Sequence, residues 1–259
     1  MVLVLAFDTE TTGLPIIPGS TWNQREELKR TLFEMGKDDY PNWTEEVLSN
    51  WPHILQISYI MFDTETSNVT EYNKYIMLED DVTIDPTAYK IHNISKDNIN
   101  AMPKTEKTKI KKALMYFIRA VKKADVIIGH NVEFDRLMVL AELMRMNNSY
   151  VEDINEIMDP HKFACTMNLM QNVCNIQMTI DYVDKNTNQK KSFKKTKPPS
   201  LSETYKHLFG YTPNDLHNSL YDSIICLRVY CMQKYGIDVA MQNNKIKQHI
   251  DSITPDIIR

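Results

Sequence analysis

Apolar residues in the first third of the chain recur in patterns that predict β-strands. Val2–Phe7 is a continuous apolar run, long enough for one buried strand. Ile54–Phe62 and Val69–Leu78 are two further strand candidates. The polar residues 63–68 between them are typical of a hairpin turn, so the chain opens with three predicted strands.

Helices and strands alternate in the rest of the chain. Apolar residues at steps of three and four predict helices, and Ser200 with Glu203 predicts a capping box for a helix that ends at Gly210. The other predicted helices are Thr105–Lys123, Val132–Met146, Thr166–Val173 and about Asn218–Tyr235, and the further strands are Val126–Gly129 and Lys162–Cys165. This order predicts an α/β fold in which a mixed five-stranded sheet carries helices on both faces.

The stretch Pro15–Pro52 lies outside this frame. It contains three tryptophans, Trp22, Trp43 and Trp51, and a predicted helix at Asn23–Met35. The tryptophans could stack on bases or pin the segment to the domain. We favour the packing interpretation for Trp51, which abuts a predicted strand.

A second such segment, Ile176–Pro199, is rich in lysine. Met178–Val183 is strand-like, and a polar turn at Asp184–Gln189 followed by a return strand would make a positively charged hairpin. Its lysines could neutralise nucleic-acid phosphates or could form a solvated loop, and the sequence favours neither interpretation. We expect residues 1–259 to form a single domain with insertions at about 15–52 and 176–199.

The overall charge limits how nucleic acid could bind. Net charge is −4 and the pI is about 6.0, so any nucleic-acid contact must be local. The four cysteines form no CxxC pair, which argues against structural zinc. The chain starts without a basic leader and contains no apolar run of membrane-spanning length. We therefore expect a soluble intracellular protein, cytoplasmic or nuclear, with no membrane partner.

Acidic residues mark the end of the first predicted strand and two later segments. Asp8 and Glu10 are two residues apart, so alternation places both carboxylates on one face of the sheet, where they repel each other unless a proton or cation intervenes. That pair alone is more often part of a turn than a site. Asp135 begins a predicted helix, and His217 precedes Asp222 by five residues. Four acids and one imidazole in three separate segments indicate a catalytic site.

Three motifs carry a resemblance to a known family. The sequences FDTETTG at 7–13, GHNVEFD at 129–135 and HNSLYD at 217–222 resemble the three motifs of DEDD-type 3′–5′ exonucleases of the histidine-containing (DEDDh, DnaQ-like) subclass. AYKIHNIS at 88–95 and WPHILQIS at 51–58 are similar to two further segments of that family. They depart from it at Asn93, where glycine is usual, and at Gln56, where an acid is common. Asn218 stands where the sister subclass has a tyrosine.

This resemblance implies an RNase H-like fold and a set of catalytic residues. Asp8, Glu10, Asp135 and Asp222 would bind two Mg²⁺ or Mn²⁺ ions, for which all-oxygen ligands are suited. His217 would be the general base, because an imidazole ordinarily titrates near neutral pH. The implied activity is hydrolysis of phosphodiester bonds from the 3′ end, releasing nucleoside 5′-monophosphates.

The resemblance also implies residues that contact the substrate. The residues expected at the 3′-terminal nucleotide are Thr11, Thr12, Gly13 and Leu14, and those expected near a phosphate or base are His130, Asn131 and Phe134. Core packing is an equally good interpretation for Leu14 and Phe134. The expected partner is a single-stranded or 3′-ended nucleic acid, DNA rather than RNA. A polymerase or repair protein would be needed for any proofreading role.

A second copy of FDTET, at 62–66, competes with the first as a catalytic motif. It lacks the following Thr-Gly and falls where a hairpin turn is predicted, so we interpret Asp63 and Glu65 as structural. Two rival functions also remain open: an RNase H-like endonuclease and a non-catalytic nucleic-acid-binding module. His217 argues against the first, and the presence of all five catalytic residues argues against the second.

Overall fold

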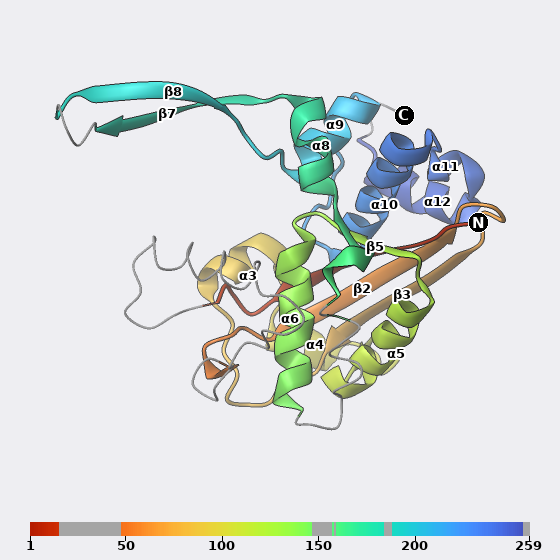
Figure 1. Ribbon diagram of the computed structural model, residues 1–259. Helices are drawn as coiled ribbons and strands as arrows, with labels where there is room; N and C mark the ends of the chain where they lie inside the picture. Colours follow the sequence, from red (N-terminus) through yellow and green to blue (C-terminus); the bar gives the residue numbers. More distant parts are fainter. Residues whose placement is uncertain (16–47, 147–156, 158, 184–187, 256–259) are drawn as a thin grey trace.

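A six-stranded mixed sheet forms the centre of the computed structural model, which describes residues 1–15, 48–146, 157, 159–183 and 188–255 (Figure 1). Its strand order is β4-β3-β2-β1-β5-β6. Strand β2 pairs antiparallel with both β1 and β3. The β1–β5, β5–β6 and β3–β4 pairs are parallel. The strands are β1 (Leu3–Thr11), β2 (Ile54–Asp63), β3 (Val69–Ile76), β4 (Lys107–Thr108), β5 (Val126–Gly129) and β6 (Phe163–Cys165).

Helices cover both faces of this sheet. Leu5 and Phe7 of β1 belong to the core cluster with α5 and α6, whereas Val4 and Ala6 point to the opposite face, against α10 and the helices around it. The helices are α3 (Pro86–His92), α4 (Lys96–Ala101), α5 (Ile110–Lys123), α6 (Val132–Arg145), α8 (Thr166–Cys174), α9 (Leu201–Phe209), α10 (Ser219–Tyr235), α11 (Val239–Gln242) and α12 (Asn244–Ile253), with a short 3₁₀ turn at Pro160–Lys162. The RNase H-like mixed α/β fold predicted from the sequence is confirmed.

The sixth strand was not predicted. Residues 105–109 were expected to begin a helix, but Lys107 and Thr108 pair with the free edge of β3 and α5 starts only at Ile110. The backbone N–H groups of Tyr75 and Met77 donate to the carbonyls of Glu106 and Thr108 at 3.0 and 2.9 Å. Satisfying this open edge favours an extended conformation over an extra helical turn.

Local signals account for the short helices that the sequence analysis did not predict. The Asp85 carboxylate caps α3 and Pro86 occupies its first turn, and the Ser95 hydroxyl caps α4. Asn93 ends α3 with a left-handed backbone at φ 56°. The glycine expected there is therefore replaced by the residue type that best tolerates this conformation after glycine.

The described residues include only the ends of the first inserted segment, 15–52, but most of the second, 176–199. Trp51 is buried in the core cluster of α5 and α6, which confirms the packing interpretation for that residue. Trp22, Trp43 and the predicted helix Asn23–Met35 lie outside the described residues. The lysine-rich segment forms the predicted hairpin, a separate two-stranded sheet of β7 (Gln177–Val183) and β8 (Lys190–Thr196).

None of the helices in the described part of the chain is long and apolar enough to cross a membrane.

Candidate active site

Strand β1 carries the first two acids on the face that packs against α10. Asp8 and Glu10 follow Val4 and Ala6 in the alternation of the strand, so their carboxylates point toward that helix. In the antiparallel pairing with β2, Asp8 lies opposite Ser58 and Glu10 lies opposite Gln56. The site is thus built on the central strand of the sheet.

Polar groups of β2 fasten the first turn of α10 to this face. The hydroxyls of Ser58 and Ser219 are 2.6 Å apart, and the Gln56 side-chain oxygen accepts from the Ser219 backbone N–H at 3.4 Å. The Gln56 amide also donates to Asn73 at 2.9 Å, which an acid at this position could not do when ionised. This anchoring holds Asp222, in the same helical turn, against β1.

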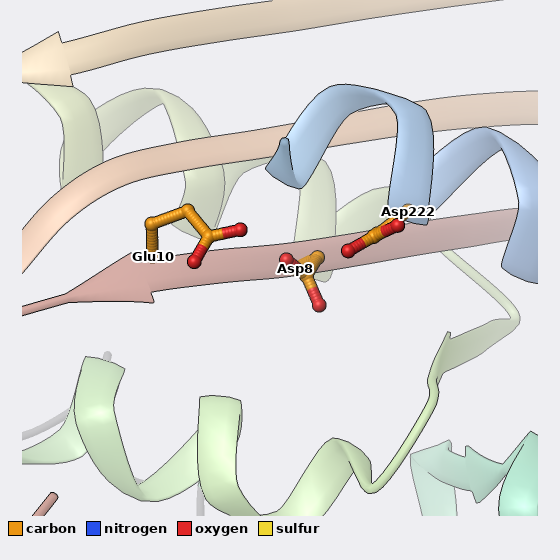
Figure 2. Close-up of side chains that lie close together, drawn as sticks. All are labelled: Asp8, Glu10 and Asp222. Atoms are coloured by element: carbon orange, nitrogen blue, oxygen red, sulfur yellow. The ribbon is translucent and has the colours of Figure 1, made fainter. Parts of the chain in front are cut away.

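Asp8, Glu10 and Asp222 form a group of carboxylates in which one oxygen from each lies within 4.8 Å of the others (Figure 2). One Asp222 oxygen, Oδ2, accepts from the His217 backbone N–H at 3.1 Å. The other, Oδ1, is the only buried side-chain nitrogen or oxygen in the described residues that has no hydrogen-bond partner. An orphaned buried carboxylate oxygen beside two further carboxylates matches the needs of a bound cation.

Asp135 reaches the same region from the first turn of α6. The pairing of β5 with β1 ends at Ala6, so the backbone N–H of Thr9 lacks a strand partner on that side. Asp135 Oδ1 accepts from this N–H at 2.9 Å and from the Thr9 hydroxyl at 2.7 Å. Asp135 is therefore outside the three-oxygen group, yet it is close enough to act electrostatically on Asp8 and Glu10.

Simultaneous ionisation of all four carboxyl groups is strongly unfavourable. Burial, and then the charges of Asp135, Asp222 and Glu10, hold the pKa of Asp8 well above its usual range. Burial followed by the charges of Asp222 and Asp135 raises the pKa of Glu10 to about 9. Burial raises the pKa of Asp135 and that of Asp222 to about 7. Such a cluster holds protons near neutral pH unless divalent cations replace them.

His217 is joined to the carboxylate cluster through its backbone. Its backbone adopts a left-handed conformation at φ 71°, and its side chain is exposed immediately before α10. The hydrogen bond from its N–H to Asp222 fixes the residue next to the carboxylates.

Comparison with known proteins identifies the family. A sequence model described as exonuclease (RNase_T) matches residues 5–230. The chain belongs to this exonuclease family. No curated protein matched the chain by sequence.

Solved structures similar to this exonuclease share its fold at low sequence identity. The nuclease domain of 3′hExo, a DEDDh family member, bound to rAMP, is 11% identical with a TM-score of 0.51, over 90% of this chain and 92% of that one. A 3′-exonuclease structure concerned with recognition of the histone mRNA stem-loop is 12% identical, with a TM-score of 0.50 over 91% and 83% of the two chains. Cell-death related nuclease 4 is 10% identical, with a TM-score of 0.51 over 90% of this chain and 62% of its own length.

The residues expected at the 3′-terminal nucleotide lie at the end of β1. The Thr11 hydroxyl donates to the Gly13 carbonyl at 2.7 Å, and the Thr12 hydroxyl accepts from the His53 N–H at 2.8 Å. Both threonines are buried, so they shape the backbone of this segment. Leu14 is 73% exposed, which argues against core packing and leaves its side chain free to meet a ligand.

Three residues were expected near a phosphate or base, and they lie in different environments. The two ring nitrogens of His130 are each 3.0 Å from a protein oxygen, the Thr166 hydroxyl and the Pro199 carbonyl. Asn131 is exposed at the start of α6, with a left-handed backbone at φ 65°. Phe134 is partly buried against the α5–α6 core, as the packing alternative predicted.

His92 is a residue of this site that the sequence analysis did not select. Its Nδ1 accepts from the Ile94 N–H at 3.0 Å, so Nε2 carries the proton that it donates to the Thr11 carbonyl at 3.1 Å. Burial, together with the nearby His217, lowers the pKa of His92. The signal lay in the segment AYKIHNIS, whose resemblance to the family was evident but whose contact with the first motif was not.

Proposed function

We propose that this chain is a metal-dependent 3′–5′ exonuclease that releases nucleoside 5′-monophosphates. The observation that carries this proposal is the group of Asp8, Glu10 and Asp222, with the orphaned Asp222 Oδ1, in a chain that belongs to the exonuclease family. The crystal structure of the 3′hExo nuclease domain with rAMP supports a mononucleotide product. The five residues assigned to catalysis are Asp8, Glu10, Asp135, His217 and Asp222.

The donor set fits two hard divalent cations, Mg²⁺ or Mn²⁺. The three clustered side chains offer only carboxylate oxygens, and Asp135 keeps a second oxygen available after Oδ1 has bound Thr9. Two such ions, when bound, would polarise the attacking water and neutralise charge on the scissile phosphate and the departing 3′ oxygen. The protein's own part is to hold these carboxylates in place.

His217 is proposed as the general base. The side chain is exposed to water, and the backbone N–H donates to the Asp222 carboxylate. An imidazole there can accept the proton of the attacking water and later release it to solvent. Asn218 occupies the position of the sister subclass's tyrosine, and its side chain caps α10.

Labelled linear and circular strands test the function directly. With Mg²⁺ or Mn²⁺, a 5′-labelled linear strand should shorten progressively from its 3′ end, and a 3′-labelled strand should yield labelled mononucleotide at once. A circular strand should survive, whereas an endonuclease would cut it. Binding without hydrolysis in the presence of Mg²⁺ would instead support the non-catalytic module.

The substrate is proposed to be a single strand or a recessed 3′ end, with DNA as the first candidate. RNA is the alternative, because one structure of similar fold concerns recognition of a histone mRNA stem-loop. Parallel assays on DNA and RNA strands of one sequence decide between them. We further propose that residues 1–259 act as one exonuclease domain.

A further inference from the structure

The β7–β8 hairpin has no core of its own, although it carries large apolar side chains. Every residue of β7 except Ile180, and every residue of β8 except Thr196, is exposed. Tyr182 and Phe193 are 45% and 49% exposed, and their rings meet edge to face with centroids 5.9 Å apart. Aromatic residues held rigidly in solvent contribute little to folding and are typical of a binding surface.

Strand register sorts the hairpin into two unlike faces. Residues paired across the two strands share a face. One face, here called the platform, consists of the pairs Met178 with Lys195, Ile180 with Phe193, and Tyr182 with Lys191. The opposite face carries Lys190 and Lys194 among polar residues, with Val183 as its one apolar member. The aromatic rings are thus grouped with two of the lysines.

The hairpin is locally basic in an acidic protein. Its two strands hold four lysines and a single acid, Asp181, which lies on the face opposite the platform. The chain as a whole has a net charge of −4. A positive platform of this kind complements a polyanion and would repel a second copy of itself.

The base of the hairpin is tied to the second catalytic motif. The Lys197 N–H donates to the Ile176 carbonyl at 2.8 Å and closes the hairpin. Two residues further on, the Pro199 carbonyl bonds to His130, which begins the segment leading to Asp135. From there the hairpin extends away from the body toward the side of the molecule where β1 ends and α3 lies (Figure 1).

We propose that the platform of the β7–β8 hairpin is a binding arm for single-stranded nucleic acid. Bases stack on Tyr182 and Phe193 while Lys191 and Lys195 contact the phosphates between them. The arm holds the part of the strand that lies 5′ of the nucleotide being removed. This inference rests on the proposed function, because it assigns the arm to the substrate of that site. Stacking is tolerant of sequence, so the arm favours long strands without selecting particular bases.

Matched variants test the platform. Tyr182→Leu with Phe193→Leu keeps apolar contact across the hairpin but removes the stacking surfaces, and Val183→Thr on the opposite face is its control. Lys191→Gln with Lys195→Gln removes the platform charges, and Lys190→Gln with Lys194→Gln makes the same charge change on the other face. Circular dichroism and melting curves establish that each variant is folded.

Binding and hydrolysis are measured separately. The dissociation constant of a labelled 20-nucleotide strand is taken from fluorescence anisotropy at several salt concentrations, with Asp8→Asn in every variant to prevent hydrolysis. We expect the leucine pair to weaken binding about 5-fold or more per ring. The platform lysine pair should flatten the salt slope by roughly 1.4, at about 0.7 for each phosphate that is no longer neutralised. Both controls should remain at the parental values.

Hydrolysis of a trinucleotide, which is too short to reach the arm, separates this inference from the proposed function. With Asp8 restored, every hairpin variant should cleave the trinucleotide at the parental rate, and only the two platform variants should show a raised KM for long strands. A parental affinity for the long strand in the leucine pair would overturn the platform. So would an equal loss of affinity in the two lysine pairs with no loss in the leucine pair. A parental dimer that dissociates on the leucine changes would also overturn it. If the parent cleaves neither substrate, the proposed function fails instead.

Discussion

The pentapeptide FDTET occurs at 7–11 and again at 62–66, and the two copies have opposite environments. In the first copy, Asp8 and Glu10 lie within β1, which is flanked by β2 and β5. In the second, Asp63 ends β2 at the far end of the sheet, opposite Leu3, and the chain then turns. Asp63 Oδ1 accepts from the Glu65 and Thr66 N–H groups at 2.9 and 3.3 Å.

Electrostatics follow these environments. Burial and neighbouring acids raise the pKa of Asp8, whereas a hydrogen bond from the backbone N–H of Glu65 lowers the pKa of Asp63. Glu65 is exposed and lies 3.7 Å from the chain's own amino terminus. The same five residues therefore contribute to a buried carboxylate cluster only where other elements bring Asp135 and Asp222 near them. The surrounding elements, rather than the five residues alone, therefore determine the electrostatics of each copy.

The largest expected effect comes from removing one acid of the first copy or its partners. Asp8→Asn, Asp135→Asn or Asp222→Asn should abolish hydrolysis with the fold intact, by at least about 10³-fold. Cation stabilisation of the transition state is worth several kcal/mol, and about 1.4 kcal/mol is tenfold in rate. Steady-state rates with Mg²⁺, alongside far-ultraviolet circular dichroism, give the comparison. Near-parental activity in any of the three would remove that residue from the site.

The next largest effect is expected at His217, which has no counterpart near the second copy. His217→Ala should reduce kcat by about 10²–10⁴-fold, because a positioned general base contributes that much to the rate. Substrate affinity should change far less, and His217→Tyr should not fully restore turnover. Single-turnover rates and anisotropy titrations separate the two quantities. An unchanged kcat would mean that this imidazole is structural.

The sequence allowed most of this architecture to be predicted, for physical reasons that differ between elements. The ends of β5 and α10 were predicted to within one residue, because an apolar run and clear caps mark them. Strand β1 continues four residues beyond its predicted end at Phe7, because its polar residues 8–11 still pair with β2. The two-residue strand β4 has no such pattern. It forms because β3 leaves an open edge, which is a property of the assembled sheet.

The site shows the same division between local and assembled features. The pairing of Asp8 with Glu10 followed from alternation, and the addition of Asp222 followed from the family resemblance. The bond of Asp135 to Thr9 did not, because it depends on where β5 stops pairing with β1. The contact between His92 and the Thr11 carbonyl likewise joins residues far apart in sequence, and no local pattern reports it.

That contact gives a way to sharpen the comparison, because Thr11 is the last residue of the first copy. His92→Ala should lower kcat/KM about 5- to 10-fold, as loss of one hydrogen bond of about 1 kcal/mol lets the end of β1 move. His92→Gln can still donate an N–H to the Thr11 carbonyl and should recover part of the loss. Cation affinity measured by calorimetry should remain parental in both. A parental kcat/KM in His92→Ala would show that this contact does not position the motif.

Stability without metal should reveal the raised pKa values of the first copy. A carboxyl whose pKa is higher in the folded than in the unfolded state stabilises the fold while protonated, and this stabilisation is lost as pH rises. With chelator present, the melting temperature should fall as pH rises from about 5 toward 9, the range bounded above by the Glu10 pKa of about 9.

Removing one charge should weaken that pH dependence. Asp222→Asn should melt higher than the parent above pH 7, by roughly 2–4 °C for each kcal/mol of repulsion relieved. Asp63→Asn removes a carboxylate whose pKa is lowered, so it should give no such gain. Scanning calorimetry in chelator at a series of pH values makes the comparison. A pH-independent difference between parent and Asp222→Asn would contradict the repulsion argument.

The smallest expected effect, and the most direct test of the comparison, is in the second copy itself. Asp63→Asn with Glu65→Gln should leave kcat/KM within a few-fold of the parent, because both side chains serve an exposed turn at the far end of β1. Asn at 63 can still accept the backbone N–H bonds through its amide oxygen, so the turn should persist. Asp8→Asn with Glu10→Gln is the matched change in the first copy, and the two doubles carry the same loss of charge. Equal inactivation of the two doubles would mean that the site depends on overall charge rather than on the buried group that β1 and α10 build.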